Sequence, residues 1–219
     1  MSRLLFSKTG RAKYISHLDL MRTFQRAFQR ADLKIKHTEG FNPHPFISIL
    51  LPLSLGYSSQ CEILDFQLIE DIPCQDVPER LNAVLPEGIQ VERCYEDGKK
   101  AKELAWVEYS VNMEYDDRSV IGVAAAWEEL LGRDKLEVVK KSKKAKSGET
   151  IVDIIPLVKS YSITENEAIV LDIVIRAQNP GLNPQLLLTA FGAEYPEYAP
   201  DFISIHRKAV MDEARNLFE

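Results

Sequence analysis

The residue types best suited to chemistry gather in one part of the chain, positions 11–45. Three of the four histidines, His17, His37 and His44, lie there. An imidazole can move protons near neutral pH, so His17 is the candidate general base of an RNA-cleaving site. The alternative is that the three histidines fix a loop by hydrogen bonding. Their spacing matches no standard ligand pattern, and we therefore expect no metal site.

Charge is distributed unevenly along the chain. Residues 1–48 carry nine basic and three acidic side chains, a balance of +6, whereas the whole chain of 219 residues has a net charge of −6. A cationic segment on an otherwise acidic protein is typical of contact with an anionic partner.

A helix over residues 17–31 must position most of these side chains. Ser16 with Asp19 three residues later has the spacing of a capping box, which marks a helix start. We expect the core face of this helix to consist of Leu18, Met21, Phe24 and Phe28. The opposite face carries a stripe of Arg22, Arg26 and Arg30. No acid lies between Asp19 and Asp32, which favours a binding surface over a plain solvated face.

The turn that leads into this helix is also basic. Arg11 and Lys13 follow Gly10, so their side chains and the free N–H groups of the first helical turn could converge on a phosphate. The alternative is a plain strand-to-helix connection, because the segment has no glycine pattern of a nucleotide-binding loop.

The segment Gly40–Pro45, with the sequence GFNPHP, is a stiff turn that could present a ligand contact. Its two prolines fix φ and its glycine can adopt a positive φ. A rigid turn would present Phe41, Asn42 and His44 to a ligand with little loss of entropy. A stiff crossover without a ligand is the alternative.

A second basic segment lies far from the first, in residues 140–146. Its candidate contacts are Lys140, Lys141, Lys143 and Lys144. Such runs of lysine are usually solvated loops, and the alternative is an electrostatic arm that reaches a nucleic-acid backbone.

The elements expected in residues 1–97 follow the order β-α-β-β-α-β of a ferredoxin-like domain. The helices are expected at residues 17–31 and 77–85. The strands are expected at residues 4–6, 33–37, 46–51, 62–70 and 89–95, of which 33–37 and 46–51 form one interrupted strand.

A similar order is expected in residues 103–219, so the predicted fold is α+β with two tandem ferredoxin-like units. The helices are expected at residues 119–132 and 185–191, the second of them started by Asn183 and Pro184. The strands are expected at residues 107–115, 136–139, 150–155, 168–177 and 202–209, with the lysine-rich segment as a hairpin loop.

Composition places the chain among globular proteins of the cytoplasm. No apolar run is long enough for a signal peptide or a membrane span. The cysteines Cys61, Cys74 and Cys94 are odd in number and widely spaced, which fits neither a disulfide framework nor a metal motif. A reducing cytoplasm is therefore expected.

Several motifs together resemble an uncharacterised family of radical-SAM-linked proteins, a domain found alone or fused behind a cobalamin-binding radical-SAM domain. The motifs span Ser16–Arg22, Arg26–Ala31, Glu39–Pro45 and Pro52–Gly56, followed by the acids Glu62 and Asp65. The resemblance covers most of residues 2–200. One departure is Phe46, which stands where the family pattern has a lysine.

The resemblance implies an accessory or recognition role in a radical-SAM system, with RNA or the ribosome as partner, because genes of this family often lie near those of ribosomal proteins and ribonucleases. The chain has no CxxxCxxC motif for an iron–sulfur cluster, so it cannot carry radical-SAM chemistry alone. We expect no cofactor.

The leading hypothesis is therefore a non-catalytic module that recognises RNA or the ribosome and serves a separate radical-SAM enzyme. Two alternatives remain open. One is a metal-independent RNA endonuclease that resembles the tandem ferredoxin-like processing enzymes of CRISPR systems, with His17 as general base. The other is a protein–protein adaptor whose acidic second half docks a basic partner.

Overall fold

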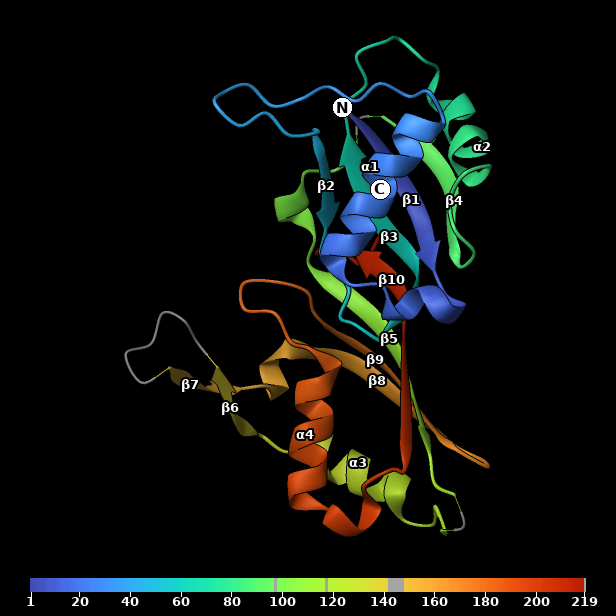
Figure 1. Ribbon diagram of the computed structural model, residues 1–219. Coiled ribbons are helices and arrows are strands. Elements are labelled where there is room, and N and C mark those ends of the chain that lie inside the picture. The colour runs from blue at the N-terminus through green and yellow to red at the C-terminus, as the bar shows by residue number, and fades with distance from the viewer. Residues whose placement is uncertain (97, 117, 142–147, 219) are drawn as a thin grey trace. The chain divides into compact units, whose positions relative to one another are not determined.

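The computed structural model describes residues 1–96, 98–116, 118–141 and 148–218 (Figure 1). The described residues form a mixed α+β fold with four α-helices. It divides into two compact units. Unit 1 comprises Met1–Glu103, Arg207–Ala209 and Leu217–Glu219, and unit 2 comprises Leu104–His206 and Val210–Asn216. None of the described helices is both long and apolar enough to cross a membrane.

Unit 1 contains an antiparallel sheet and two helices. The elements are β1 (Ser2–Lys8), α1 (His17–Arg30), β2 (Ile47–Leu50), β3 (Ser58–Phe66), α2 (Val77–Asn82) and β4 (Ile89–Tyr95). The strands lie in the order β4-β1-β3-β2, and each neighbouring pair is antiparallel. The order along the chain is thus β-α-β-β-α-β, as expected from the sequence.

The core of unit 1 lies between α1, α2 and one face of the sheet, with Phe6 of β1 against Phe24 of α1 at a ring distance of 4.8 Å. The expected core face of α1 was wrong at Leu18, which is 67% exposed. The buried face begins at Leu20 and continues through Phe24 and Phe28. Since each residue turns the helix by about 100°, Leu18 lies roughly opposite Leu20.

The expected strand at residues 33–37 is not a continuous strand. The segment forms only two isolated bridges, from Ile35 to Leu68 and from His37 to Pro45. It leaves α1 through Asp32, whose φ of 52° is left-handed, a conformation that aspartate tolerates better than most residues. Backbone hydrogen bonds of 2.8 Å, from Lys36 to the carbonyl oxygen of Gln67 and from Ile69 to that of Lys34, place the segment beside the residues that follow β3.

Unit 2 repeats the alternation of strands and helices with an inserted hairpin. Its elements are β5 (Trp106–Glu114), α3 (Val123–Leu131), β6 (Glu137–Lys141), β7 (Glu149–Asp153), β8 (Val158–Glu165), β9 (Ile169–Arg176), α4 (Pro184–Glu194) and β10 (Phe202–Met211). The strand order is β10-β5-β9-β8, and β6 pairs with β7. The strand β8 was not expected, because most of its side chains are exposed and polar.

The core of unit 2 is built around the two helices. The rings of Trp127 on α3 and Phe191 on α4 stack with a centroid distance of 4.0 Å. The expected start of α4 is confirmed, because the side chain of Asn183 accepts a hydrogen bond of 2.9 Å from the backbone N–H of Gln185.

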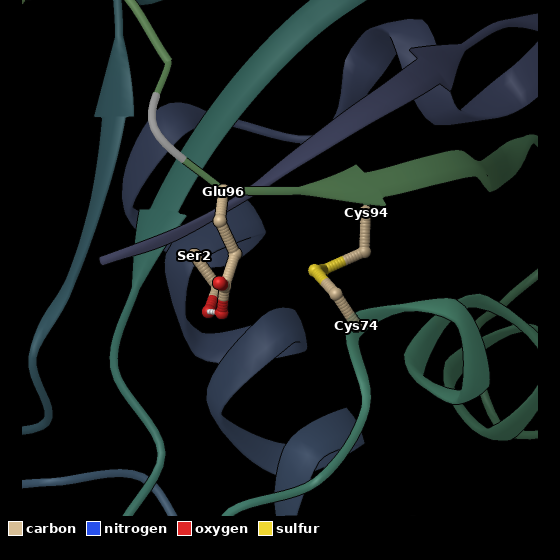
Figure 2. The surroundings of a disulfide bond; sticks show 4 residues. All are labelled: Ser2, Cys74, Cys94 and Glu96. Atoms are coloured by element: carbon tan, nitrogen blue, oxygen red, sulfur yellow. Dashed lines mark hydrogen bonds between the residues drawn. A yellow bond between two sulfur atoms is a disulfide. The ribbon is translucent and has the colours of Figure 1, made fainter.

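Two cysteines of unit 1 form a disulfide, so the expectation that the cysteines fit no disulfide was wrong. Figure 2 shows the bond between Cys94 on β4 and Cys74, just before α2. The two residues are 20 positions apart in the chain, yet their Cα atoms lie 5.3 Å apart because β4 returns past the start of the α2 segment. Cys61 takes no part in this disulfide and is half-buried.

We expect replacement of Cys74 and Cys94 by alanine to lower the free energy of unfolding of unit 1 by about 3 kcal/mol, since a cross-link of this loop length restricts the unfolded chain. Far-UV circular dichroism during urea unfolding measures the change. Tryptophan fluorescence provides an internal control, because Trp106 and Trp127 both lie in unit 2. An unchanged unfolding curve for unit 1 would contradict the expected role of the disulfide.

Candidate functional site

Two of the basic side chains counted from the sequence are buried and do not contribute to a charged surface. Arg3 forms an ion pair of 2.6 Å with Asp65 and is 4% exposed. Lys8 is 1% exposed, and its ammonium group donates hydrogen bonds to the carbonyl oxygens of Ile15 at 2.8 Å and Lys13 at 3.3 Å. Burial lowers the pKa of Lys8. Both cations therefore hold unit 1 together.

The acids Glu62 and Asp65 of β3 do not form a shared site. Asp65 pairs with Arg3, whereas Glu62 accepts a hydrogen bond of 2.8 Å from Arg207. Their spacing of three residues places them on opposite faces of the strand. The Glu62–Arg207 pair is deeply buried, and the second carboxylate oxygen of Glu62 has no partner among the described residues. Arg207 also donates to the carbonyl oxygen of Leu51 at 2.8 Å.

The N-terminus of α1 is closed by its own side chains. Ser16 accepts a hydrogen bond of 3.2 Å from the backbone N–H of Asp19, which confirms the expected cap, and donates one of 2.7 Å to the Asp19 carboxylate. The bond from Ser16 and the ion pair with Arg22 lower the pKa of Asp19. A carboxylate thus already occupies the positive end of the helix, which argues against a phosphate site there.

The exposed face of α1 carries free positive charge in its second half. Arg26 and Arg30 are exposed and take part in no ion pair among the described residues. Arg22 pairs with Asp19 at 3.0 Å, but both side chains are more than half exposed. Such a surface pair is weak and exchanges readily with another anion. The arginine stripe predicted from the sequence is therefore a surface feature of unit 1.

The GFNPHP segment is the tip of a hairpin formed by residues 36–46, which we call the loop hairpin. Backbone hydrogen bonds join Phe46 to Lys36 at 2.7 Å and Thr38 to His44 at 2.9 Å. The Thr38 hydroxyl also accepts a hydrogen bond of 3.1 Å from the backbone N–H of His44. In Figure 1 this hairpin is part of the long blue connection between α1 and β2.

His44 fixes the loop hairpin from within. Its Nδ1 atom lies 3.1 Å from the Thr38 hydroxyl and 3.2 Å from the carbonyl oxygen of Asn42. Gly40 takes the positive φ that its place in the turn requires, at 126°. Phe41 at the tip is fully exposed, and Asn42 is exposed beside it. The hairpin therefore presents an aromatic ring on a hydrogen-bonded frame.

The three histidines are not brought together. His17 is exposed at the first residue of α1, whereas His37 comes seven residues after Arg30, the last residue of that helix. A helix of 14 residues is about 20 Å long, which separates the two. No group of three or more metal-ligating side chains occurs among the residues that the structure describes. A catalytic role of His17 stays a prediction.

A pocket of about 350 Å³ lies between the second half of α1 and the start of the loop hairpin. It is lined by Gln25, Phe28, Gln29, Asp32, Leu33, Lys34, Ile35, His37, Pro45 and Ile69. The sequence interpretation missed Gln25 and Gln29, although their spacing of four residues puts them on one side of a helix. Each glutamine is followed by an arginine, and the charge of the arginines dominates the sequence pattern of this helix.

The remaining candidates belong to other parts of the chain. Lys140 on β6 donates a hydrogen bond of 3.0 Å to the carbonyl oxygen of Gly181, so its ammonium group is engaged within unit 2. Lys141 is the last residue of β6 and pairs in register with Glu149. Lys143 and Lys144 lie outside the described residues. Arg11 is exposed before α1, and the ammonium group of Lys13 lies 5.2 Å from the ring centre of Tyr14.

Comparison with known proteins gives a fold relative and a family. No curated protein matches the chain. A solved chain from the structure described as "Crystal Structure of a Cbf5-Nop10-Gar1 Complex" is similar, with a TM-score of 0.54 and 8% identity. The similarity covers 97% of this chain and 50% of that chain, so this chain spans about half its length, and at this identity it shows the fold alone. The family model described as "Uncharacterized protein conserved in bacteria (DUF2344)" matches residues 2–184, and the chain belongs to that family.

Proposed function

We propose that the protein is a recognition module for RNA, either free or within the ribosome, without chemistry of its own. The observation that carries the proposal is the exposed pair Arg26 and Arg30 on α1, which take part in no ion pair among the described residues of an acidic protein. Positive side chains that lack internal partners are available to phosphates. Arg22 and Arg11 extend the same charge along unit 1.

The loop hairpin supports single-stranded RNA as the form that is recognised. Phe41 is fully exposed at its tip, and the hydrogen bonds of Thr38 and His44 hold the backbone beneath it. Exposed aromatic rings stack on unpaired bases, while arginines track the backbone of the same strand. A duplex would offer its phosphates to the arginines but no unstacked base to Phe41.

The strand orders support a finer description of the fold. We propose that unit 1 is a ferredoxin-like domain and that unit 2 is a second one with the hairpin β6–β7 inserted after its first helix. The orders β4-β1-β3-β2 and β10-β5-β9-β8 correspond position by position. We also propose a separate radical-SAM enzyme as a protein partner, and this rests only on the motifs from Ser16 to Asp65 that resemble the radical-SAM-linked family.

Salt dependence tests the proposed function. We expect a fluorescein-labelled single-stranded RNA of mixed sequence to bind with a slope of log K against log salt near −3, because four arginines would each displace about 0.7 counterions. Affinity should then fall about 50-fold between 50 and 200 mM salt. Fluorescence anisotropy measures both quantities. Binding that is absent, or that does not change with salt, would contradict the proposal.

A further inference from the structure

The pocket beside α1 combines an apolar base with polar groups that lack partners. Phe28, Leu33 and Ile35 are buried beneath it. The amides of Gln25 and Gln29 form no hydrogen bond with other described residues, and neither does the imidazole of His37. A volume of about 350 Å³ is at the small end of sites for small molecules, so the pocket fits one compact ligand group.

The polar groups of this pocket suit a flat heterocycle. Each glutamine amide both donates and accepts hydrogen bonds, and the carboxylate of Asp32 adds acceptors at the same rim. Side-chain amides form paired hydrogen bonds with the edges of nucleobases, and an imidazole ring can stack on the face of an unpaired base. The apolar base of the pocket provides a surface for the ring itself.

The walls of the pocket are held in place before any ligand binds. Lys34 forms an ion pair of 2.6 Å with Glu70, and the backbone N–H of Ile69 donates to the carbonyl oxygen of Lys34 at 2.8 Å. On the other side, the bridge between His37 and Pro45 begins the loop hairpin. A site with fixed walls loses little entropy on binding.

The charge next to the pocket fits a ligand that carries phosphate. Arg26 and Arg30 directly follow Gln25 and Gln29 in α1, so each arginine lies about 100° around the helix from a glutamine that lines the pocket. Neither arginine lines the pocket, so their guanidinium groups lie on the exposed face of the helix next to the glutamines. A base in the pocket would bring the phosphates on either side of it toward these arginines.

We propose that this pocket takes one unstacked nucleobase of the bound RNA strand, with Arg26 and Arg30 on the adjoining phosphates. The inference rests on the proposed RNA function. A free mononucleotide presents the same chemistry, a base with a phosphate beside it, and the test distinguishes the two sources.

The test uses the full chain with Gln25→Leu and Gln29→Leu together, which keep the side-chain bulk and remove both amides. The probe is a fluorescein-labelled single-stranded RNA 12-mer, in one form intact and in the other with its central nucleotides abasic. We expect the double variant to bind the intact RNA at least tenfold more weakly with an unchanged salt slope, since the arginines remain. The variant Gln90→Leu, at an exposed position of β4, is the matched control and should bind like the wild type.

The outcomes distinguish failure of the base pocket from failure of the RNA function. Equal affinity of the double variant and the wild type, or of the intact and abasic RNA, would overturn the base pocket and leave the RNA function standing. If the wild type binds no RNA, titration with AMP, GMP, CMP and UMP follows. Binding of a mononucleotide that is lost in the double variant would assign the pocket to a free nucleotide and refute the RNA function. No binding in either arm overturns both.

Discussion

Replacing Arg207 with alanine is expected to lower the free energy of unfolding of unit 1 by about 3–5 kcal/mol. The change would leave the Glu62 carboxylate buried, with its ion-pair partner Arg207 removed and its other oxygen already without a hydrogen bond among the described residues. An uncompensated buried charge is among the most costly defects in a protein interior. Far-UV circular dichroism during urea unfolding measures the loss.

Two controls separate the buried charge from the loss of packing. The double change Glu62→Leu with Arg207→Met removes both charges and keeps side-chain volume, so its stability should lie closer to that of the wild type. Arg22→Ala removes an exposed arginine from the same unit and should leave the unfolding midpoint near that of the wild type. If Arg207→Ala costs no more than Arg22→Ala, the buried pair is not what stabilises unit 1.

Reversing two charges on α1 should have the largest effect on binding. We expect Arg26→Glu with Arg30→Glu to weaken binding of single-stranded RNA by at least 100-fold at 50 mM salt, because two attractive contacts become repulsive. The salt slope should become shallower by about 1.4, the contribution of two phosphate contacts to a single strand. Fluorescence anisotropy over a salt series gives both values.

A matched pair of lysines tests whether position or net charge matters. Lys100→Glu with Lys102→Glu changes the charge of the protein by the same amount at exposed positions near the end of the first unit. We expect this control to retain most of the affinity and the slope. Equal losses in the two double variants would show that binding follows total charge and that α1 is not the RNA surface.

Local sequence signals were sufficient for much of the fold. The cap Ser16, the cap Asn183 and the strand Ile89–Tyr95 were all predictable, because each depends on residues next to one another in the chain. Leu18 was assigned to the core because its spacing from Met21 and Phe28 fits one apolar helix face, yet its side chain is 67% exposed. The edge strand β8 lacks an apolar alternation strong enough to identify it.

The features that the sequence did not reveal depend on contacts between residues that are not neighbours in the chain. Burial of Lys8 depends on carbonyl groups that the following turn supplies, and the Cys74–Cys94 bond depends on the return of β4. The pocket needs Gln25 and Gln29 beside His37, which follows only from the path of the chain after Asp32. Residue types and spacing predicted the cationic helix, but only the tertiary structure shows that Arg26 and Arg30 are exposed whereas Arg3 and Lys8 of β1 are buried.

Arg207 belongs to unit 1 although it lies within β10, and this limits how the chain can be divided into fragments. Unit 1 is discontinuous, since the partner of Glu62 is supplied more than a hundred residues after Glu103, from within β10. A fragment that stops at the link between the units would retain every candidate RNA contact of α1 and yet lack the ion-pair partner of its buried Glu62 carboxylate. Unit 1 is therefore not expected to fold as a separate fragment of residues 1–103, although most of the unit lies within those residues.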